Sequence, residues 1–452
     1  MGKKIFDYLI IGDSAAGVNA AEQIRQNNQQ ASIMMLSKEP YPAYGRPLIS
    51  YMIEKKIDED CIWYRSPSFY ENHNIEVLRG AEYEAVSLDA NAHTVVLKNG
   101  ECIQYGKCLI ATGSISTTPP IKNLENAKKV FPFMTLDHAK DLLNAARVAT
   151  DSSHREGKLS TAVIIGAGLI GLKAAEALVG HVDEVIVVSR RWILPQVLDP
   201  DAGAVLQKSL EEAGIQCLTG AAAKDLTLVD NRIHEVALDD GTTIACDVLV
   251  SALGVRPNSA LAVHAGAAEE RGLICGNDLQ TSLCDVYAAG DVTQVNNLLD
   301  GTHSTLALWR SAVRQGKAAG AFMCGAACEP YTGDYAVNAT YFFDFPLLSA
   351  GITNPGEGSG YEVDVRIEKD CYAKFVTKDD KLKGYILLNK PENAGIYTSL
   401  IEQQIPLSSL PKDVFDRAPS NLDFPSADRW NRIHEAYPNK NESPDQRSVC
   451  NV

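Results

Sequence analysis

The chain has 452 residues, of which 45% are hydrophobic and 22% are charged, and its formal net charge is −15 at pH 7. The length suffices for two or three globular domains, while the negative charge argues against a nucleic-acid partner and against an anionic membrane surface. No uninterrupted apolar stretch reaches the roughly 18 residues that a membrane span needs. The 11 cysteines are scattered without a CxxC pair, and the N-terminal apolar run is too short for a signal peptide. We therefore expect a cytoplasmic protein with reduced thiols.

The chain begins with the pattern of a dinucleotide-binding βαβ unit. The apolar stretch "FDYLIIG" predicts a strand over residues 6–12, a helical pattern follows over 15–26, and "ASIMML" predicts a second strand over 31–36. A glycine-containing turn between such a strand and helix is where a dinucleotide pyrophosphate binds.

The turn of this unit resembles the Gly-x-Gly-x-x-Gly fingerprint, with Ser14 in place of the middle glycine. Gly12 can make the tight turn, and Gly17 can keep the helix close to the strand. The serine adds only a hydroxymethyl group, which leaves room for a pyrophosphate if its φ is negative. The helix N-terminus beyond it offers amide donors and a positive dipole end. Taken alone, the stretch also fits a glycine-poor turn in another kind of α/β protein.

Further segments carry nucleotide-binding chemistry. Glu39 follows the second strand, where an acidic group can take ribose hydroxyls, and Arg46 has the planar fork suited to a pyrophosphate. The stretch "CLIATGS" (residues 108–114) predicts a strand that ends in Ala-Thr-Gly. The stretch "DVYAAGDV" (residues 285–292) predicts one that ends in Ala-Gly-Asp, where Asp291 can accept hydrogen bonds from a ribityl chain.

A β-meander and a second nucleotide unit lie between these segments. Residues 82–113 alternate in polarity and turn at Asn99 and Gly100. The stretch "TAVIIGAGLIGLKAAEAL" (residues 161–178) predicts a strand, a turn with a complete fingerprint and a helix, and "EVIVVSRR" (residues 184–191) predicts the next strand. Two nucleotide units in one chain imply two bound nucleotides.

The C-terminal part differs in character from the rest. From Tyr331 the sequence becomes aromatic and rich in strand-forming residues, and "YAKFVTKDDKLKGYILLN" predicts a hairpin with Asp379, Asp380 and Lys381 at its turn. Residues 331–436 are therefore expected to form a further domain. The polar, aperiodic residues 437–452 predict a mobile tail.

The ordered set of first unit, Ala-Thr-Gly, second fingerprint and Ala-Gly-Asp resembles the flavin-dependent pyridine nucleotide-disulfide oxidoreductase superfamily over about residues 5–330. The stretches "PYPAYGRPLIS" and "ALWRSAVRQGKAAGAFMCG" resemble its branch of rubredoxin reductases, ferredoxin reductases and apoptosis-inducing factor. The resemblance implies an α/β fold with two Rossmann-like nucleotide-binding domains of the three-layer ββα type and a C-terminal α+β interface domain, which supports dimers or docking. FAD is then expected on residues 1–118 with 255–330, NAD(P) on 119–254, and the interface domain at 331–436.

The resemblance also implies which residues hold the two cofactors. Those expected to hold FAD are Gly12, Ser14, Ala15, Ala16, Gly17, Glu39, Arg46, Thr112, Gly113 and Asp291. Those expected to hold NAD(P) are Gly166, Gly168, Leu169, Ile170 and Gly171. The nine histidines show no spacing typical of metal ligands, so no metal site is predicted.

The sequence departs from the family in its cysteines. Many relatives relay electrons through cysteines beside the flavin, but the segment Tyr44-Gly45-Arg46 carries no sulfur, and the nearest candidate, Cys61, has no paired partner. Cys324 and Cys328 lie four residues apart near a predicted helix end, where packing as small apolar residues is favoured over a disulfide. We therefore expect electrons to leave the flavin directly, without a disulfide intermediate.

A second departure concerns the charge beside the flavin. Ferredoxin-reductase-like relatives pair a lysine after the Arg-Pro-Pro-Leu-Ser stretch with a glutamate just after the NAD(P) fingerprint, and here those positions hold Tyr51 and Lys173. We expect Lys173 to reach the flavin–nicotinamide contact and to stabilise negative charge on the reduced flavin. Lys173 and Tyr51 are therefore the candidate catalytic residues. The alternative is that Lys173 lies in solvent or pairs with Glu176, three residues further along the helix.

A third departure concerns the choice of nicotinamide cofactor. An acidic residue at the end of the second strand of such a unit binds the 2′-hydroxyl of NAD, and here Ser189 takes that place, followed by Arg190 and Arg191. These three residues are expected to bind the cofactor and to favour NADPH, because arginine binds phosphate through two parallel hydrogen bonds.

Together these patterns predict an FAD-dependent NAD(P)H oxidoreductase that transfers hydride between nicotinamide and flavin. The electron partner is expected to be rubredoxin, ferredoxin or an iron–sulfur or other metal-containing oxidoreductase subunit, and a homodimer is compatible with the extra domain. The alternatives are an NAD(P)H oxidase that uses oxygen and a flavin-bearing interaction protein whose redox state controls assembly.

Overall fold

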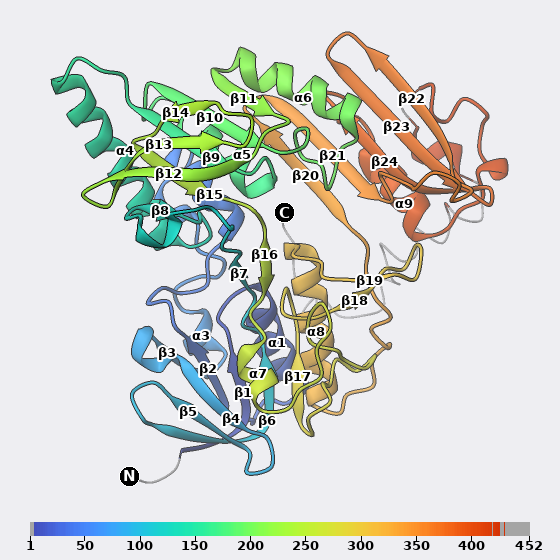
Figure 1. Cartoon of the computed structure of the whole chain (residues 1–452). Helices are drawn as coiled ribbons and strands as arrows, with labels where there is room; N and C mark the ends of the chain where they lie inside the picture. The colour runs from blue at the N-terminus through green and yellow to red at the C-terminus, as the bar shows by residue number, and fades with distance from the viewer. Residues whose placement is uncertain (1–3, 418, 425–428, 430–452) are drawn as a thin grey trace. The chain divides into compact units, whose positions relative to one another are not determined.

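The computed structural model describes residues 4–417, 419–424 and 429 (Figure 1). The chain divides into two compact units, Met1–Ala336 and Val337–Val452. The division falls shortly after residue 331, where the C-terminal domain is predicted to begin. The tail predicted at residues 437–452 lies outside the described residues.

A mainly parallel sheet carries the first fingerprint. Its parallel strands, in spatial order, are β3 (Ile75–Arg79), β2 (Ile33–Ser37), β1 (Lys4–Ile11), β6 (Cys102–Ile110) and β17 (Val286–Ala288). The sheet is covered on both faces, and residues 8–11 of β1 and 33–36 of β2 are all buried. Since these strands point the same way, their carboxyl ends lie at one edge of the sheet, where ligands of such folds bind.

The two faces of this sheet are covered differently. On one face, β5 (Thr94–Leu97) runs antiparallel to the first half of β6 and β4 (Ala85–Asp89) runs antiparallel to β5. The predicted turn at Asn99 and Gly100 joins β5 to β6. Their apolar side chains share a core with Leu9 and Ile11 of β1. On the other face lie α1 (Ala15–Asn27) and α8 (Trp309–Met323). This is the expected three-layer ββα arrangement.

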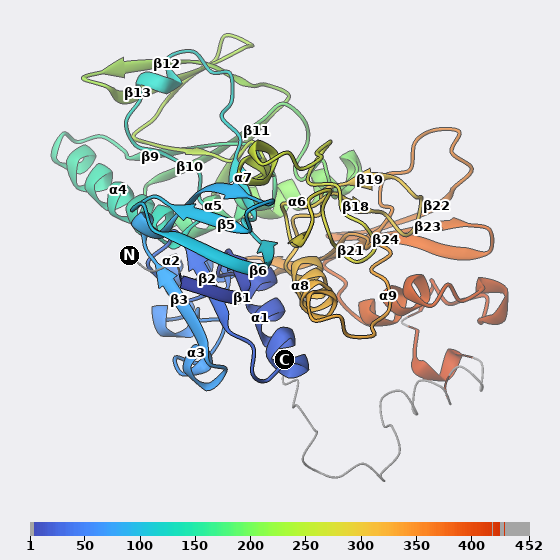
Figure 2. The same ribbon diagram turned by 90° about the horizontal axis from the view of Figure 1, so that it is seen from below.

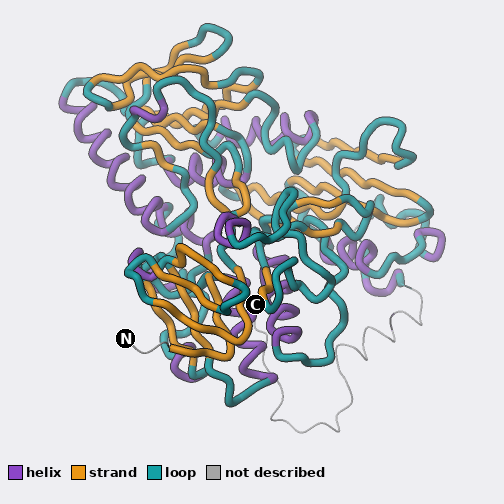
Figure 3. Tube along the Cα trace, turned by 60° about the horizontal axis from the view of Figure 1, so that its bottom comes forward, coloured by secondary structure: helices purple, strands orange, loops and turns teal. Residues whose placement is uncertain are grey.

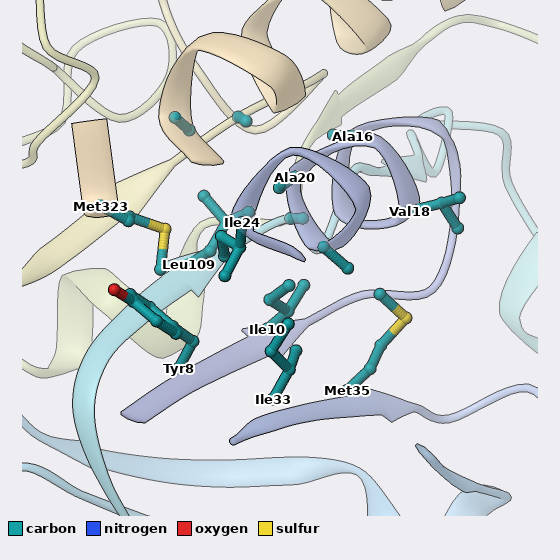
Figure 4. Packing of buried hydrophobic residues seen from close by; sticks show 14 of the residues in the cluster. Tyr8, Ile10, Ala16, Val18, Ala20, Ile24, Ile33, Met35, Leu109 and Met323 are labelled. Atoms are coloured by element: carbon teal, nitrogen blue, oxygen red, sulfur yellow. The ribbon is translucent and has the colours of Figure 1, made fainter. Parts of the chain in front are cut away.

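Helices α1 and α8 lie side by side in both views (Figures 1 and 2) and approach closely through small residues. A Cβ at Gly316 would lie 2.2 Å from the carbonyl oxygen of Ala16, and one at Gly320 would lie 2.6 Å from that of Ala20. Both glycines are therefore needed for contact between the helices. Figure 4 shows Ala16 and Ala20 of α1 above Ile10 of β1, in the core that α1 and the sheet share.

A second parallel sheet repeats this architecture. Its order is β11 (Ile215–Thr219), β10 (Glu184–Ser189), β9 (Thr161–Ile165), β15 (Val248–Ser251) and β8 (Val130–Phe131). One face packs against the antiparallel strands β12 (Ala223–Val229), β13 (Arg232–Leu238) and β14 (Thr243–Ala245). The strands also contact α4 (Leu136–Arg155), α5 (Leu169–Leu178) and α6 (Pro200–Glu212).

Two short strands join the sheets. β7 (Ser114–Ser116) follows the first sheet and pairs antiparallel with β16 (Val255–Pro257), which leads back from the second. The remaining short elements of the first unit are α2 (Ile49–Ile53), α3 (Phe69–Asn72), α7 (Ala260–His264), β18 (Val295–Asn296) and β19 (His303–Ser304). Figure 3 shows the described helices and strands in separate colours. In the described ranges, no helix has the length and hydropathy required to cross a membrane.

The second compact unit is an antiparallel sheet with one helix against it. The strand order is β20 (Val337–Phe342), β21 (Phe345–Gly351), β24 (Lys381–Leu388), β23 (Cys371–Lys378) and β22 (Glu362–Glu368). Helix α9 (Ala394–Glu402) packs on this sheet, with the ring of Tyr397 centred 5.0 Å from that of Phe375. The α+β character expected for this part is confirmed.

The hairpin between β23 and β24 is tighter than predicted. Its turn consists of Asp379 and Asp380, whose φ angles are 53° and 59°, and Lys381 already belongs to β24. Two successive residues with positive φ form the turn whose twist matches that of paired strands. The carboxylate of Asp380 also accepts a hydrogen bond of 2.9 Å from the backbone N–H of Ser408, which fixes the turn.

Candidate functional site

The outer glycines of the first fingerprint are required by the chain itself. Gly12 has a φ of +127°, and a Cβ there would lie 2.0 Å from the carbonyl oxygen of Ala111. A Cβ at Gly17 would lie 1.9 Å from the carbonyl oxygen of Gly12. No side chain fits at either position, so the turn and the close contact of α1 with β1 both need glycine.

Ser14 occupies the middle position without strain. It is the N-cap of α1, with extended backbone angles of −145° for φ and −162° for ψ, and its hydroxyl makes no capping hydrogen bond. The negative φ required for a serine at this position is therefore present. The first turn of α1, including Ala15 and Ala16, presents amide donors beside a hydroxyl that is not used as a helix cap.

The second fingerprint repeats the geometry of the first. A Cβ at Gly166, where φ is +110°, would lie 2.4 Å from the carbonyl oxygen of Ala252, and one at Gly171 would lie 2.0 Å from that of Gly166. A Cβ at Gly168, where φ is −80°, would meet nothing closer than Oε1 of Gln196 at 3.7 Å. The middle glycine therefore leaves open space beside the N-terminus of α5, where Leu169 and Ile170 begin the helix.

The two loops are also held by equivalent backbone hydrogen bonds. The N–H of Gly12 donates to the carbonyl of Leu36 at the end of β2, and the N–H of Gly166 donates to that of Val188 in β10, both at 2.9 Å. The same pattern of strand, glycine and helix thus occurs twice in the first compact unit. Each loop has the shape that accepts the pyrophosphate of a dinucleotide.

Glu39 and Arg46 lie together and are bound to each other. Nη2 of Arg46 donates to Oε1 of Glu39 at 2.5 Å, and the hydroxyl of Tyr44 donates to Oε2 of Glu39 at 2.6 Å. Nη1 of Arg46 donates to the carbonyl of Met134 at 3.0 Å. The two residues predicted to contact ribose and pyrophosphate separately therefore form one ion pair, and Tyr44 helps to orient it.

Three further predicted FAD contacts lie beyond the carboxyl ends of β6 and β17. Oγ1 of Thr112 donates to the carbonyl of Asn258 at 2.7 Å, and Gly113 has a φ of +68°. The carboxylate of Asp291 accepts from Oγ of Ser114 at 2.9 Å, and burial raises its pKa. Since β6 runs parallel to β1 on one side and to β17 on the other, these groups are at the same edge of the sheet as the first fingerprint.

A buried ion pair beside the first fingerprint was not predicted. Oδ2 of Asp13 lies 2.8 Å from Nη2 of Arg79, and its Oδ1 accepts a hydrogen bond of 2.7 Å from the hydroxyl of Tyr70. Burial raises the pKa of Asp13, and the charge of Arg79 and the bond from Tyr70 oppose that shift without cancelling it. The sequence shows Asp13 within the fingerprint, but nothing in it pairs this residue with Arg79 at the end of β3.

The residues expected to select the nicotinamide cofactor lie after β10. Ser189 ends the strand and is buried, whereas Arg190 and Arg191 are exposed. The guanidinium carbon of Arg191 lies 4.3 Å from the ring centroid of Trp192, which supports its side chain. Two arginines and a short hydroxyl residue are therefore present where NAD-binding units have an acidic group.

Lys173 is not a solvated lysine, since its side chain is only 14% exposed. Its ammonium lies 2.6 Å from Oε2 of Glu176, which is the pairing considered as the alternative to a flavin contact, and 4.6 Å from the ring centroid of Tyr51. Tyr51 belongs to α2, and α2 packs against α5. The structure therefore brings Lys173 and Tyr51 together, as the exchange of residue types in the sequence suggests.

The cysteines of the described residues form no disulfide, and no group of three or more metal-ligating side chains gathers among those residues. Cys61 is exposed beyond α2, and Cys324 and Cys328 are both free thiols. Burial raises the pKa of Cys324.

Two matched fingerprint loops in one compact unit, each at the carboxyl edge of a parallel sheet, are typical of the class of proteins that bind two dinucleotides. The family model described as pyridine nucleotide-disulphide oxidoreductase matches residues 6–316. The chain belongs to this family.

Three relatives illustrate its range. The chain is 29% identical over 405 residues to an assimilatory nitrate reductase electron transfer subunit of Bacillus subtilis (strain 168), which covers 88% of this chain and 49% of the relative. It is 27% identical to the NADH-dependent phenylglyoxylate dehydrogenase subunit epsilon of Aromatoleum evansii, and the match covers 89% of this chain and 93% of the relative. It is 30% identical to an NADH-rubredoxin oxidoreductase of Clostridium acetobutylicum, and the match covers 70% of this chain and 74% of the relative. The chain thus spans about half the length of the nitrate reductase subunit.

Solved structures confirm the fold. A NAD-dependent persulfide reductase from A. fulgidus superimposes with a TM-score of 0.80 at 24% identity, covering 95% of this chain and 83% of that chain. A covalent complex of putidaredoxin reductase with putidaredoxin matches with a TM-score of 0.78 at 20% identity, covering 96% and 99%. At these identities the likeness concerns the fold alone.

Proposed function

We propose that the chain is the flavin-bearing reductase of an electron-transfer system. In this function it accepts a hydride from NAD(P)H and passes electrons to a protein partner. The observation that carries the proposal is the repeated fingerprint geometry, which provides two dinucleotide sites in one compact unit. The segment Tyr44-Gly45-Arg46, where some relatives have a reactive cysteine, supports direct transfer from flavin to partner.

Different residues of the chain bind different parts of FAD. The amides at the start of α1 and the Ser14 hydroxyl bind the pyrophosphate, Glu39 with Arg46 orients the adenosine half, and Asp291 accepts from the ribityl chain. Thr112 and Gly113 complete the site at the end of β6. Bound FAD supplies the chemistry that a polypeptide lacks, since it takes up two electrons from a hydride and can release them singly.

The second nucleotide unit holds the nicotinamide cofactor against the first nucleotide unit. Gly166, Gly168 and Gly171 admit its pyrophosphate at the N-terminus of α5. Lys173 lies one turn further along this helix and places a positive charge toward the contact of the two rings, where it stabilises the negative charge gained on reduction. Tyr51, which belongs to the first nucleotide unit, supports the ammonium of Lys173.

We propose that NADPH is preferred to NADH. Ser189 offers no charge that repels a 2′-phosphate, and Arg190 and Arg191 can bind one. Replacing both arginines by alanine should raise the half-saturating concentration of NADPH about ten-fold or more and leave that of NADH within about two-fold, as expected for the loss of one or two charge-assisted hydrogen bonds. Equal effects on both cofactors would contradict this assignment.

The partner is proposed to be rubredoxin, ferredoxin or an iron–sulfur or other metal-containing oxidoreductase subunit. The relatives named as an electron transfer subunit, as subunit epsilon of a dehydrogenase and as a rubredoxin oxidoreductase support this class of partner. We propose a cytoplasmic location, which the scattered cysteines support. A homodimer formed through the C-terminal unit remains a prediction.

The experiment is anaerobic turnover with separate acceptors. The purified protein is mixed with NADPH and with rubredoxin, ferredoxin or neither, and oxygen is admitted in a parallel series. The proposal predicts fast reduction of an iron–sulfur protein or rubredoxin and slow oxygen consumption. Oxygen consumption faster than reduction of every protein acceptor would identify an oxidase instead, and slow flavin reduction with tight self-association would identify an assembly protein.

A further inference from the structure

A buried carboxylate lies where α5 of the second nucleotide unit packs against α2 of the first. The side chain of Glu176 is 1% exposed, and each of its oxygens faces a lysine. Oε2 lies 2.6 Å from Nζ of Lys173 on the same helix, and Oε1 accepts a hydrogen bond of 3.4 Å from Nζ of Lys56. Lys56 follows α2, so Glu176 joins residues of both units.

The two lysines also flank one aromatic ring. Nζ of Lys173 lies 4.6 Å and Nζ of Lys56 5.7 Å from the ring centroid of Tyr51. Nζ of Lys56 also lies 2.7 Å from Oε2 of Glu54, so the cluster contains two ammonium and two carboxylate groups. Burial lowers the pKa of Lys56, but the hydrogen bonds and charges of Glu54 and Glu176 outweigh it and raise that pKa.

A second contact fixes the two elements in the same place. Nε2 of His181, just after α5, lies 3.0 Å from the carbonyl oxygen of Ile53 at the end of α2. The bond from Lys56 to Glu176 and the bond between His181 and Ile53 therefore both cross from one nucleotide unit to the other. The position of Lys173 relative to Tyr51 is thus set by contacts on both sides of this boundary.

Burying a carboxylate in this position costs free energy, because the carboxylate loses its hydration. A buried ion pair is weak evidence for stability, because the loss of hydration offsets most of its attraction. The pair does provide a fixed place for a long, flexible ammonium that would otherwise lose rotamer entropy on being ordered by a ligand.

We propose that Glu176 is a positioning residue for hydride transfer: it is the shared counter-ion that holds the ammonium of Lys173 over Tyr51 and ties it, through Lys56, to the FAD-binding unit. This inference rests on the proposed function, in which Lys173 acts at the flavin–nicotinamide contact. Glu176 acts through Lys173 and not on the cofactors directly.

The test compares Glu176→Gln, Lys173→Met and the double variant with the wild type, each as FAD-loaded protein. The limiting rate of flavin reduction by NADPH should fall about ten-fold in each single variant. The half-saturating NADPH concentration should stay within about two-fold, and the double variant should be no more than about two-fold slower than Lys173→Met. Glu176→Asp should recover part of the rate. Glu212→Gln, which removes an exposed partner of Lys208 on α6, is the matched control and should change nothing.

The flavin midpoint potential gives a readout independent of turnover. Lys173→Met should lower it, because a positive charge is lost. Glu176→Gln removes a negative charge, which by itself would raise the potential. If Glu176 positions Lys173, the ammonium moves away in this variant and the potential should instead fall, by less than in Lys173→Met. Thermal unfolding of the variants should show that all remain folded.

The outcomes separate the inference from the function on which it rests. A wild-type rate and potential in Lys173→Met would refute the role of Lys173, and the inference with it. A slow Lys173→Met beside a wild-type Glu176→Gln, a raised potential in Glu176→Gln, or multiplied rate losses in the double variant would each refute the positioning role of Glu176 alone. If Glu176→Gln fails to fold, Lys56→Met replaces it. This variant should show smaller falls in the rate of flavin reduction and in the flavin midpoint potential. Wild-type values in Lys56→Met would refute the inference.

Discussion

At the scale of single residues, the middle position of each fingerprint differs from the outer two in what surrounds it. The outer glycines are enclosed by the protein's own carbonyl oxygens, whereas Gly168 faces open space and Ser14 takes the equivalent place in the first loop. The outer glycines are therefore required by the fold, and we propose that the middle positions serve the ligand. A serine is compatible with the middle position but not with either outer position.

Substitutions in the second fingerprint should separate these two roles. Gly166→Ala should destabilise the protein by at least about 2 kcal/mol, because its Cβ would collide with a backbone oxygen at a positive φ. Gly168→Ala should leave the free energy of unfolding unchanged or raise it by about 0.4–1 kcal/mol, yet weaken NADPH binding about ten-fold or more. Denaturant unfolding and nucleotide titration of the two variants measure both effects. Equal destabilisation in both variants would contradict the distinction.

At the scale of elements, sequence patterns locate the nucleotide units well because strand and helix periodicity is local. The helix predicted at residues 15–26 is α1, which spans Ala15–Asn27, and the predicted turn at Asn99 and Gly100 is present. Contacts between distant segments leave no such local signal. The pair of Asp13 with Arg79 and the bond from Lys56 to Glu176 each join residues that are far apart in the sequence, and only the folded chain brings them together.

The strand β8 shows the same limit within one sheet. Its two residues, Val130–Phe131, precede the second fingerprint in the chain but pair with β15 at the edge of the sheet. In the first sheet the corresponding edge strand, β17, comes long after the fingerprint. A strand of two residues has no measurable periodicity, so only tertiary pairing defines it.

The packing of α1 on α8 should be sensitive to one methyl group. Gly316→Ala should destabilise the protein by about 1–3 kcal/mol, because the added Cβ would lie 2.2 Å from the carbonyl oxygen of Ala16. The displaced α1 should also hold FAD less tightly. Lys317→Ala, at an exposed position of the same helix, is the control. Full FAD retention and unchanged unfolding in Gly316→Ala would mean that the helices can separate without consequence.

The link between α4 and the second sheet predicts a pH dependence of stability. The N–H and hydroxyl of Ser160 and the ring of His154 on α4 bond to the carboxylate of Asp183, and these bonds lower its pKa to about 2. A lowered folded-state pKa stabilises the protein above the ordinary value near 3.9, and that contribution is lost as the pH falls from about 4 through 2.

Chemical unfolding of Asp183→Asn measures this contribution. The variant should be less stable than the wild type at about pH 5.5, and the difference should shrink toward zero by about pH 2. Asp151→Asn, exposed on α4, serves as the control and should show no such convergence. A stability difference that stays constant over this range would show that the ionised form of Asp183 is not the form stabilised.

At the scale of the whole molecule, the proposed function requires a flavin that exchanges electrons without a disulfide relay. The family and the fold are shown by residues 6–316 and by the solved structures, whereas the acceptor depends on a partner that the chain does not contain. The number of electrons that the isolated protein takes up is therefore a more direct test than the identity of its partner.

The most direct measurement is an anaerobic reductive titration of the purified protein, together with determination of its FAD content. We expect one FAD per chain and the uptake of about two electrons per flavin, since the cysteines of the described residues form no disulfide. Uptake of about four electrons per flavin, with thiols appearing in step, would reveal a redox-active disulfide and contradict the account. A protein that neither contains FAD nor binds it on reconstitution would contradict it more fundamentally.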